Sequence, residues 1–137
     1  MTTPATGTAP DAAPTRRFDV AIVGAGYVGV PLSQVFAEAG KRVVLLDVSE
    51  ERVAQLNRGE SYIEDVPSTV MGALVRDRGL RATTDYYVLR EADAILIALP
   101  TPLSRQREPD LSIVRAATEQ IATRLRRGHL VVLESTT

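Results

Sequence analysis

Three glycines lie close together near the start of the chain: Gly24, Gly26 and Gly29. They directly follow the short apolar run Phe18–Val23, and they precede a segment with helical spacing. A glycine-rich bend between an apolar strand and a helix is the beginning of the strand–turn–helix unit of parallel α/β sheets. The bend therefore predicts such a sheet, and the remaining segments must be compatible with one.

The rest of the chain alternates between apolar runs and helical patterns. Runs without polar alternation fit strands that are covered on both faces. They lie at Phe18–Val23, Val43–Leu46, Ala94–Leu99 and Leu130–Leu133, with a weaker run at Leu80–Thr84. Because alternating strands and helices imply right-handed parallel crossovers, the sequence predicts a single α/β domain over residues 18–137 with a Rossmann-type, doubly wound parallel sheet.

Four helices are predicted between these strands. An apolar face that recurs every three or four residues defines the first, which Gly40 stops: Val28, Leu32, Val35, Phe36 and Ala39. Ser49 is predicted to cap a second helix that ends at Arg58, and a third covers Pro67–Arg78. The last helix is expected to have Asp110 as its N-cap and, before Gly128, to bury Val114, Ala117, Ile121 and Leu125.

Composition and charge narrow the classes of function. The chain has 137 residues and a formal net charge of −1, so no electrostatic field favours nucleic acid or an anionic membrane as partner. It contains no cysteine, which excludes disulfides, thiolate metal sites and a cysteine nucleophile within these residues. Residues 1–17 have few large apolar side chains and no signal-peptide pattern, so we expect a disordered leader and a cytoplasmic protein.

The glycine bend carries the most specific chemical signal. Gly24–Gly29 matches G-x-G-x-x-G, and Asp47 ends the next predicted strand 23 positions after Gly24. In the dinucleotide-binding fingerprint, the first glycine allows a tight turn, the second lets the pyrophosphate approach the backbone, and the third lets the helix pack on the sheet. The N–H groups from Gly26 to Val28 would face the pyrophosphate. Asp47 would accept hydrogen bonds from the adenine ribose and repel a 2′-phosphate, which favours NAD over NADP.

Other candidate residues follow two later strands. Thr101, between two prolines, would present a hydroxyl at the edge where ligands of open α/β sheets bind, although an ordinary exit loop explains it equally well. The stretch Glu134–Thr137 follows the last strand in the same way, with a frayed terminus as the alternative. Arg105 and Arg107 could reach a substrate phosphate or a partner domain, but solvated loop charges are the simpler interpretation.

Three further groups are interpreted as structural. Glu50 and Glu51 suit the positive end of the second helix. Three cations suit the negative end of the last helix: Arg124, Arg126 and Arg127. His129 has no carboxylate or serine at a telling spacing, so it is also expected to be structural.

Taken together, these motifs resemble the N-terminal, NAD-binding domain of the UDP-glucose/GDP-mannose dehydrogenase family, over residues 18–137. The resemblance rests on a collinear set of stretches: Val23–Gly29, Asp47 with Arg52 five residues later, Asn57–Ile63, Pro100–Pro102, Glu108–Leu111 and Glu134–Thr136. Two stretches, Ser61–Ile63 and Arg107–Asp110, are most similar to UDP-N-acetylglucosamine 6-dehydrogenases and the related UDP-N-acetylmannosamine enzymes.

The resemblance implies roles for residues of this chain. Tyr27 and Val28 would contact NAD through the turn backbone, and Asp47 and Arg52 would hold the adenosine. The nicotinamide side would be lined by Thr101, Ser135 and Thr136. Thr137 aligns with a threonine that helps to position water in relatives.

The resemblance also implies what this chain cannot do. The family oxidises C6 of a nucleotide sugar to a carboxylate with two NAD, using a cysteine with lysine and asparagine helpers that lie after the position of Thr137. We therefore expect a truncation after the last strand and NAD binding without turnover. A UDP-N-acetylhexosamine would be a substrate of the full-length parent only, and that parent is expected to be a homo-oligomer.

Three other functions stay open at this point. A stand-alone NAD-sensing Rossmann module, as in regulators of potassium transport, has a similar glycine turn and acidic residue, but would not need Thr101 or Thr136. Short-chain reductases and epimerases normally place three residues between the first two glycines, unlike Gly24 and Gly26. A flavin-binding relative would more usually carry an acidic residue longer than Asp47.

Overall fold

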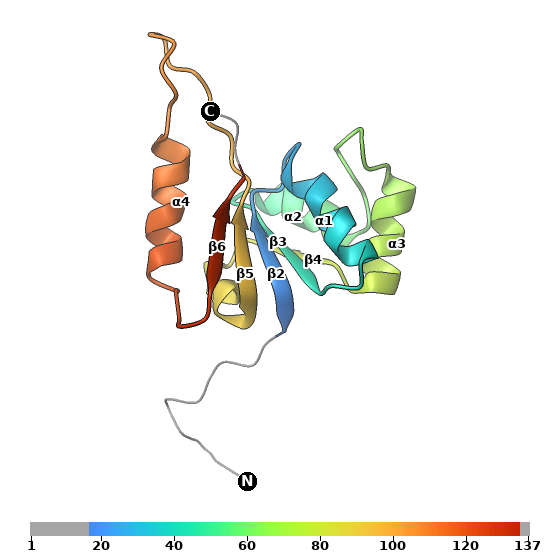
Figure 1. Ribbon diagram of the computed structural model, residues 1–137. Helices are drawn as coiled ribbons and strands as arrows, with labels where there is room; N and C mark the ends of the chain where they lie inside the picture. The colour runs from blue at the N-terminus through green and yellow to red at the C-terminus, as the bar shows by residue number, and fades with distance from the viewer. Residues whose placement is uncertain (1–16, 135–137) are drawn as a thin grey trace.

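The computed structural model describes residues 17–134, and a five-stranded parallel sheet forms the centre of this part of the chain (Figure 1). Its strands are β2 (Phe18–Val23), β3 (Val43–Leu46), β4 (Arg81–Thr83), β5 (Ala92–Ile97) and β6 (Leu130–Leu133). They lie in the order β4-β3-β2-β5-β6, with every neighbouring pair parallel. Because the chain moves from β2 to one edge and then returns to the other side of β2, this is the doubly wound Rossmann order that the sequence predicts.

Helices cover both faces of the sheet. The helices α1 (Gly29–Glu38), α2 (Glu50–Asn57) and α3 (Ser68–Arg78) lie on one side of it in Figure 1, and α4 (Ser112–Ala122) lies on the other. A short 3₁₀ helix, η1 (Tyr86–Glu91), which the sequence pattern did not reveal, adds to the core on the α4 side. Alternate side chains of each central strand serve the two cores.

Local sequence explains how α2 is held at both ends. The Ser49 hydroxyl accepts a hydrogen bond from Arg52 N at 3.2 Å, which confirms the predicted N-cap. At the other end, the Asn57 side chain donates to Ala82 O and accepts from Ala82 N, both at 2.9 Å. The amide of Asn57 thus pairs with β4 as a strand residue would. The C-terminal end of the helix is thereby tied to β4.

The prediction of which face of α1 is buried was wrong. Its buried residues are small or β-branched: Gly29, Val30, Ser33 and Ala37. Val28 and Val35 are exposed instead, and Leu32 and Phe36 pack only partly against the core. The helix lies so close to the sheet that small residues form the contact, and the Ser33 hydroxyl satisfies itself by donating to Val30 O at 2.6 Å.

Three boundaries also differ from prediction. The helix α4 ends at Ala122, so Leu125 is exposed and the three predicted C-terminal arginines, Arg124, Arg126 and Arg127, lie beyond the helix. Its N-cap is Leu111, although Asp110 still accepts a hydrogen bond from Ser112 N at 3.0 Å. Strand β5 begins and ends two residues before the predicted Ala94–Leu99.

The apolar run of β6 predicted a strand that is covered on both faces. Within the described residues, β6 is not covered in this way. Leu130, Val131 and Leu133 are exposed. The strand lies at the edge of the sheet, and the core residues of α4, Ala117 and Ile121, pack with side chains of the more central strands. The predicted leader, apart from Arg17, lies outside the described residues.

Candidate functional site

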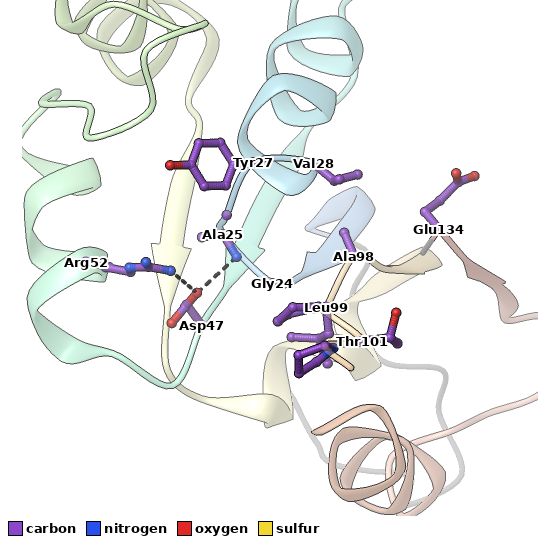
Figure 2. Close-up of a pocket in the computed structure, with 13 residues that line it drawn as sticks. Gly24, Ala25, Tyr27, Val28, Asp47, Arg52, Ala98, Leu99, Thr101 and Glu134 are labelled. Carbon is purple, nitrogen blue, oxygen red and sulfur yellow. Dashed lines mark hydrogen bonds and ion pairs between the residues drawn. The ribbon is translucent and has the colours of Figure 1, made fainter. Parts of the chain in front are cut away.

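The candidate site lies at the carboxyl edge of the sheet, where β2, β3 and β5 end side by side. A cavity of about 520 Å³ opens there, with the glycine turn on one side and the segment after β5 on the other (Figure 2). Thirteen residues line it: Gly24, Ala25, Gly26, Tyr27, Val28, Asp47, Arg52, Ala98, Leu99, Pro100, Thr101, Pro102 and Glu134. The topology therefore brings together residues that follow four strands, β2, β3, β5 and β6, at the switch point between β2 and β5.

Two of the three glycines are required by the backbone itself. Gly24 has φ of +111°, and a Cβ there would lie 2.5 Å from Ala98 O. A Cβ on Gly29 would lie 1.8 Å from Gly24 O and 3.3 Å from a methyl group of Ile22. These surroundings fit the predicted roles of a tight turn and a close contact between helix and sheet.

Gly26 differs from both, because a Cβ there would meet no other described part of the chain within 4 Å. Folding therefore does not require glycine at this position. Gly26 lines the cavity, and the next two residues, Tyr27 and Val28, are exposed at its rim. The first backbone hydrogen bond of the helix that follows runs from Val30 N to Gly26 O. The N–H groups from Gly26 to Val28 precede that bond, as expected for donors to an anion.

Asp47 lies between the turn and α2, with its side chain only 11% exposed. Its Oδ2 accepts a hydrogen bond from Ala25 N at 3.0 Å, and its Oδ1 accepts one from Ser49 N at 2.9 Å. The Arg52 guanidinium, half exposed, is 3.8 Å from Oδ2, and Figure 2 shows it beside the carboxylate. The carboxylate is thus held rigidly, while its remaining lone pairs can still accept hydrogen bonds from a ligand.

A second cavity, of about 650 Å³, meets the first at Asp47, Arg52, Leu99 and Pro100. The rest of its lining is mostly apolar and comes from the ends of β2 and β3, from η1 and from α4: Val23, Leu46, Val48, Tyr86, Ile113, Ala116, Ala117 and Gln120. The cavity beside the turn, where the backbone of the glycine bend is open, and the apolar cavity beyond Asp47 therefore adjoin.

The later candidates are only partly brought to this site. Thr101 is half-buried and lines the first cavity. Glu134 also lines it, whereas Ser135, Thr136 and Thr137 lie outside the described residues. Arg105 and Arg107 are exposed on a small hairpin closed by the antiparallel bridge between Leu103 and Pro109, and neither lines the two cavities.

The sequence pattern missed Tyr62, whose hydroxyl donates to Ala25 O at 2.6 Å. Its ring lies 5.0 Å from the guanidinium carbon of Arg52. Ala25 is 37 residues away in sequence, so no local spacing could reveal the contact. The only indication of its importance in the sequence was that the Asn57–Ile63 stretch resembles relatives, and this resemblance assigned no role to the tyrosine.

The structure supports the structural interpretation of His129 and gives Arg126 a role beyond the helix end. His129 Nδ1 accepts from Arg126 N at 3.1 Å, and burial lowers the pKa of the imidazole. The Arg126 guanidinium donates to Arg90 O at 3.0 Å and Ala92 O at 3.1 Å, which ties the segment before β6 to the start of β5. Among residues 17–134, no cluster of potential metal ligands occurs, and no helix is long and apolar enough to cross a membrane.

Comparison with known proteins agrees with the family resemblance that the sequence motifs indicate. Residues 18–137 match the NAD binding domain of the UDP-glucose/GDP-mannose dehydrogenase family. A UDP-N-acetyl-D-mannosamine dehydrogenase of Salmonella typhi is 42% identical over 118 residues, which are 85% of this chain and 27% of that protein. An NDP-N-acetyl-D-galactosaminuronic acid dehydrogenase of Ralstonia nicotianae is also 42% identical over the same shares.

Solved structures agree. A UDP-D-ManNAc dehydrogenase from Pyrococcus horikoshii is 32% identical, with a TM-score of 0.80 over 86% of this chain and 28% of its own. A UDP-glucose dehydrogenase from Pyrobaculum islandicum also has a TM-score of 0.80, at 29% identity, over 96% of this chain and 31% of its own. The chain therefore spans between a quarter and a third of the length of these relatives. It belongs to the UDP-glucose/GDP-mannose dehydrogenase family and corresponds to that family's NAD-binding domain.

Proposed function

We propose that this chain binds NAD across the two joined cavities. The pyrophosphate lies on the N–H groups from Gly26 to Val28, and Asp47 accepts hydrogen bonds from the adenine ribose. The adenine enters the second, apolar cavity, with Arg52 beside the ribose. The nicotinamide extends towards Thr101 and Glu134, the side on which Ser135 and Thr136 are also expected to act.

The observation that carries this proposal is the open position at Gly26. Apart from its chain neighbours, no atom of residues 17–134 lies within 4 Å of a Cβ built there, so the missing side chain leaves space on the cavity side rather than relieving a contact. A bare backbone followed by free helix N–H groups suits a diphosphate. A rigid, nearly buried carboxylate on the neighbouring strand suits a ribose diol.

The proposal extends to the longer protein that the relatives represent. There this domain would supply NAD, which accepts hydride, to a dehydrogenase that oxidises C6 of a UDP-N-acetylhexosamine to a carboxylate in two steps. The chain has no cysteine, so the nucleophile expected for that reaction cannot come from these residues. The 137 residues alone are therefore expected to bind NAD and not to turn over substrate, and the parent is expected to act as a homo-oligomer.

Calorimetric titration of the chain with NAD and NADP tests the proposal. We expect NAD to bind at least about tenfold more tightly, since a 2′-phosphate would lie against the carboxylate of Asp47. Asp47→Asn is the matched variant, because its Oδ1 can still accept from one of the two backbone N–H groups. This substitution should reduce the difference in affinity between the two dinucleotides, because it weakens NAD binding and strengthens NADP binding. Equal affinity of the wild type for both dinucleotides, or binding of neither, would contradict the proposal.

A further inference from the structure

The loop between α2 and α3 reaches the glycine turn through the side chain of Tyr62. The hydroxyl of this tyrosine donates to Ala25 O at 2.6 Å, and its partly buried ring packs against the core on the α1–α3 side. Burial raises the pKa of Tyr62 to about 12, so the hydroxyl keeps its proton and remains a donor at neutral pH. Tyr62 lines neither cavity.

The contact fixes a peptide group that matters for anion binding. Ala25 O and Gly26 N belong to one planar peptide, in which C=O and N–H point in opposite directions. Holding Ala25 O therefore also sets the direction of the Gly26 N–H, the first of the three donors proposed to meet the pyrophosphate. Because Gly26 lacks a Cβ, its backbone resists a flip of this peptide only weakly. A flip would turn the carbonyl oxygen towards the anion.

The same tyrosine also contacts the acidic end of the site. Its ring centroid lies 5.0 Å from the guanidinium carbon of Arg52, a cation–π distance. Arg52 in turn pairs with Asp47 at 3.8 Å, and Asp47 holds Ala25 N at 3.0 Å. Ala25 is thus held at its N–H by Asp47 and at its C=O by Tyr62. The two contacts connect the turn and the ribose-binding carboxylate into one network.

We propose that Tyr62 is a positioning residue of the dinucleotide site: its hydroxyl fixes the Ala25–Gly26 peptide, and its ring holds Arg52 beside Asp47. This inference rests on the proposed function, because it names what prepares that site for NAD. Tyr62 acts through the turn and through Arg52, without touching the cofactor. Such preparation lowers the ordering cost of binding and so raises affinity.

Two substitutions separate the two contacts, and a third controls for them. Tyr62→Phe removes only the hydroxyl and should weaken NAD binding about 3- to 10-fold, the usual effect of one hydrogen bond. Tyr62→Leu also removes the ring and should weaken binding by a further factor of roughly 2 to 5. Tyr87→Phe is the matched control, since Tyr87 is exposed and lines neither cavity. It should leave NAD affinity unchanged.

Amide hydrogen exchange of the nucleotide-free chain, followed by NMR, gives a readout that does not depend on NAD. We expect faster exchange at Ala25, whose N–H donates to Asp47 at 3.0 Å, in Tyr62→Phe than in the wild type or Tyr87→Phe. Melting temperatures should show that all three proteins are folded. Unchanged exchange at the Ala25 amide would overturn the inference. If the wild type failed to bind NAD, the proposed function would fall and the positioning role with it, whereas faster exchange in Tyr62→Phe would still show that the Tyr62 hydroxyl holds the turn.

Discussion

The glycines of the turn have different surroundings. Substitutions at Gly26 and Gly29 can therefore test cofactor binding and folding separately. A Cβ on Gly26 would project into open space, whereas one on Gly29 would lie 1.8 Å from Gly24 O. Gly26→Ala should therefore change the free energy of unfolding by no more than about 1 kcal/mol, while NAD affinity falls at least about tenfold as the pyrophosphate is held away.

Gly29→Ala is the matched comparison for that substitution. It forces the turn and α1 apart, so it should destabilise the chain by about 2 kcal/mol or more. Urea denaturation gives both stabilities, and calorimetry gives both affinities. A folded Gly26→Ala protein with wild-type affinity would show that the pyrophosphate does not lie on this peptide.

At the scale of residues, the sequence could predict the positions that a motif defines and not those that only packing defines. Gly24, Gly29 and Asp47 have fixed roles within a strand–turn–helix unit, so their spacing was enough to predict them. Gly24 and Asp47 line one cavity, and Gly29 packs against Gly24 O. Tyr62 and Arg126 act through contacts with backbone atoms 37 and 34–36 residues away. Such contacts depend on how loops return to the sheet, which no local pattern contains.

At the scale of elements, the side chain of Asn57 ties the end of α2 to β4. It forms two hydrogen bonds with the buried Ala82, which would otherwise have an unsatisfied N–H and C=O. Asn57→Ala should therefore cost about 2 kcal/mol of stability, measured by urea denaturation. Arg58→Ala, which removes an exposed pair with Glu60, is the control and should cost less than about 1 kcal/mol. Equal losses in the two variants would argue against this role.

The element boundaries show where pattern and packing disagree. The apolar spacing of α1 was real, yet the helix buries a different face, because close approach to the sheet favours glycine, alanine and serine over larger residues. The apolar run of β6 predicted burial, but among residues 17–134 this strand lies at the edge of the sheet, where its side chains are mostly exposed. Order and type of the main elements followed from the sequence, since alternating strands and helices admit few topologies.

At the scale of the whole molecule, the strand order places the site. Because β2 lies between β3 and β5, the segments that follow these three strands meet at one edge, and the two cavities join there. The second cavity could not be predicted from sequence, because its lining combines η1, α2, α4 and the ends of three strands. Its position next to Asp47 would give the proposed dinucleotide a path from adenine to nicotinamide.

A crystal structure of the chain soaked with NAD tests this account most directly. We expect the pyrophosphate within hydrogen-bond distance of the N–H groups of Gly26, Tyr27 and Val28, with the ribose hydroxyls on Asp47 and the adenine in the second cavity. Density for the dinucleotide with an adenosine remote from Asp47, or a pyrophosphate that makes no contact with the turn amides, would contradict the account.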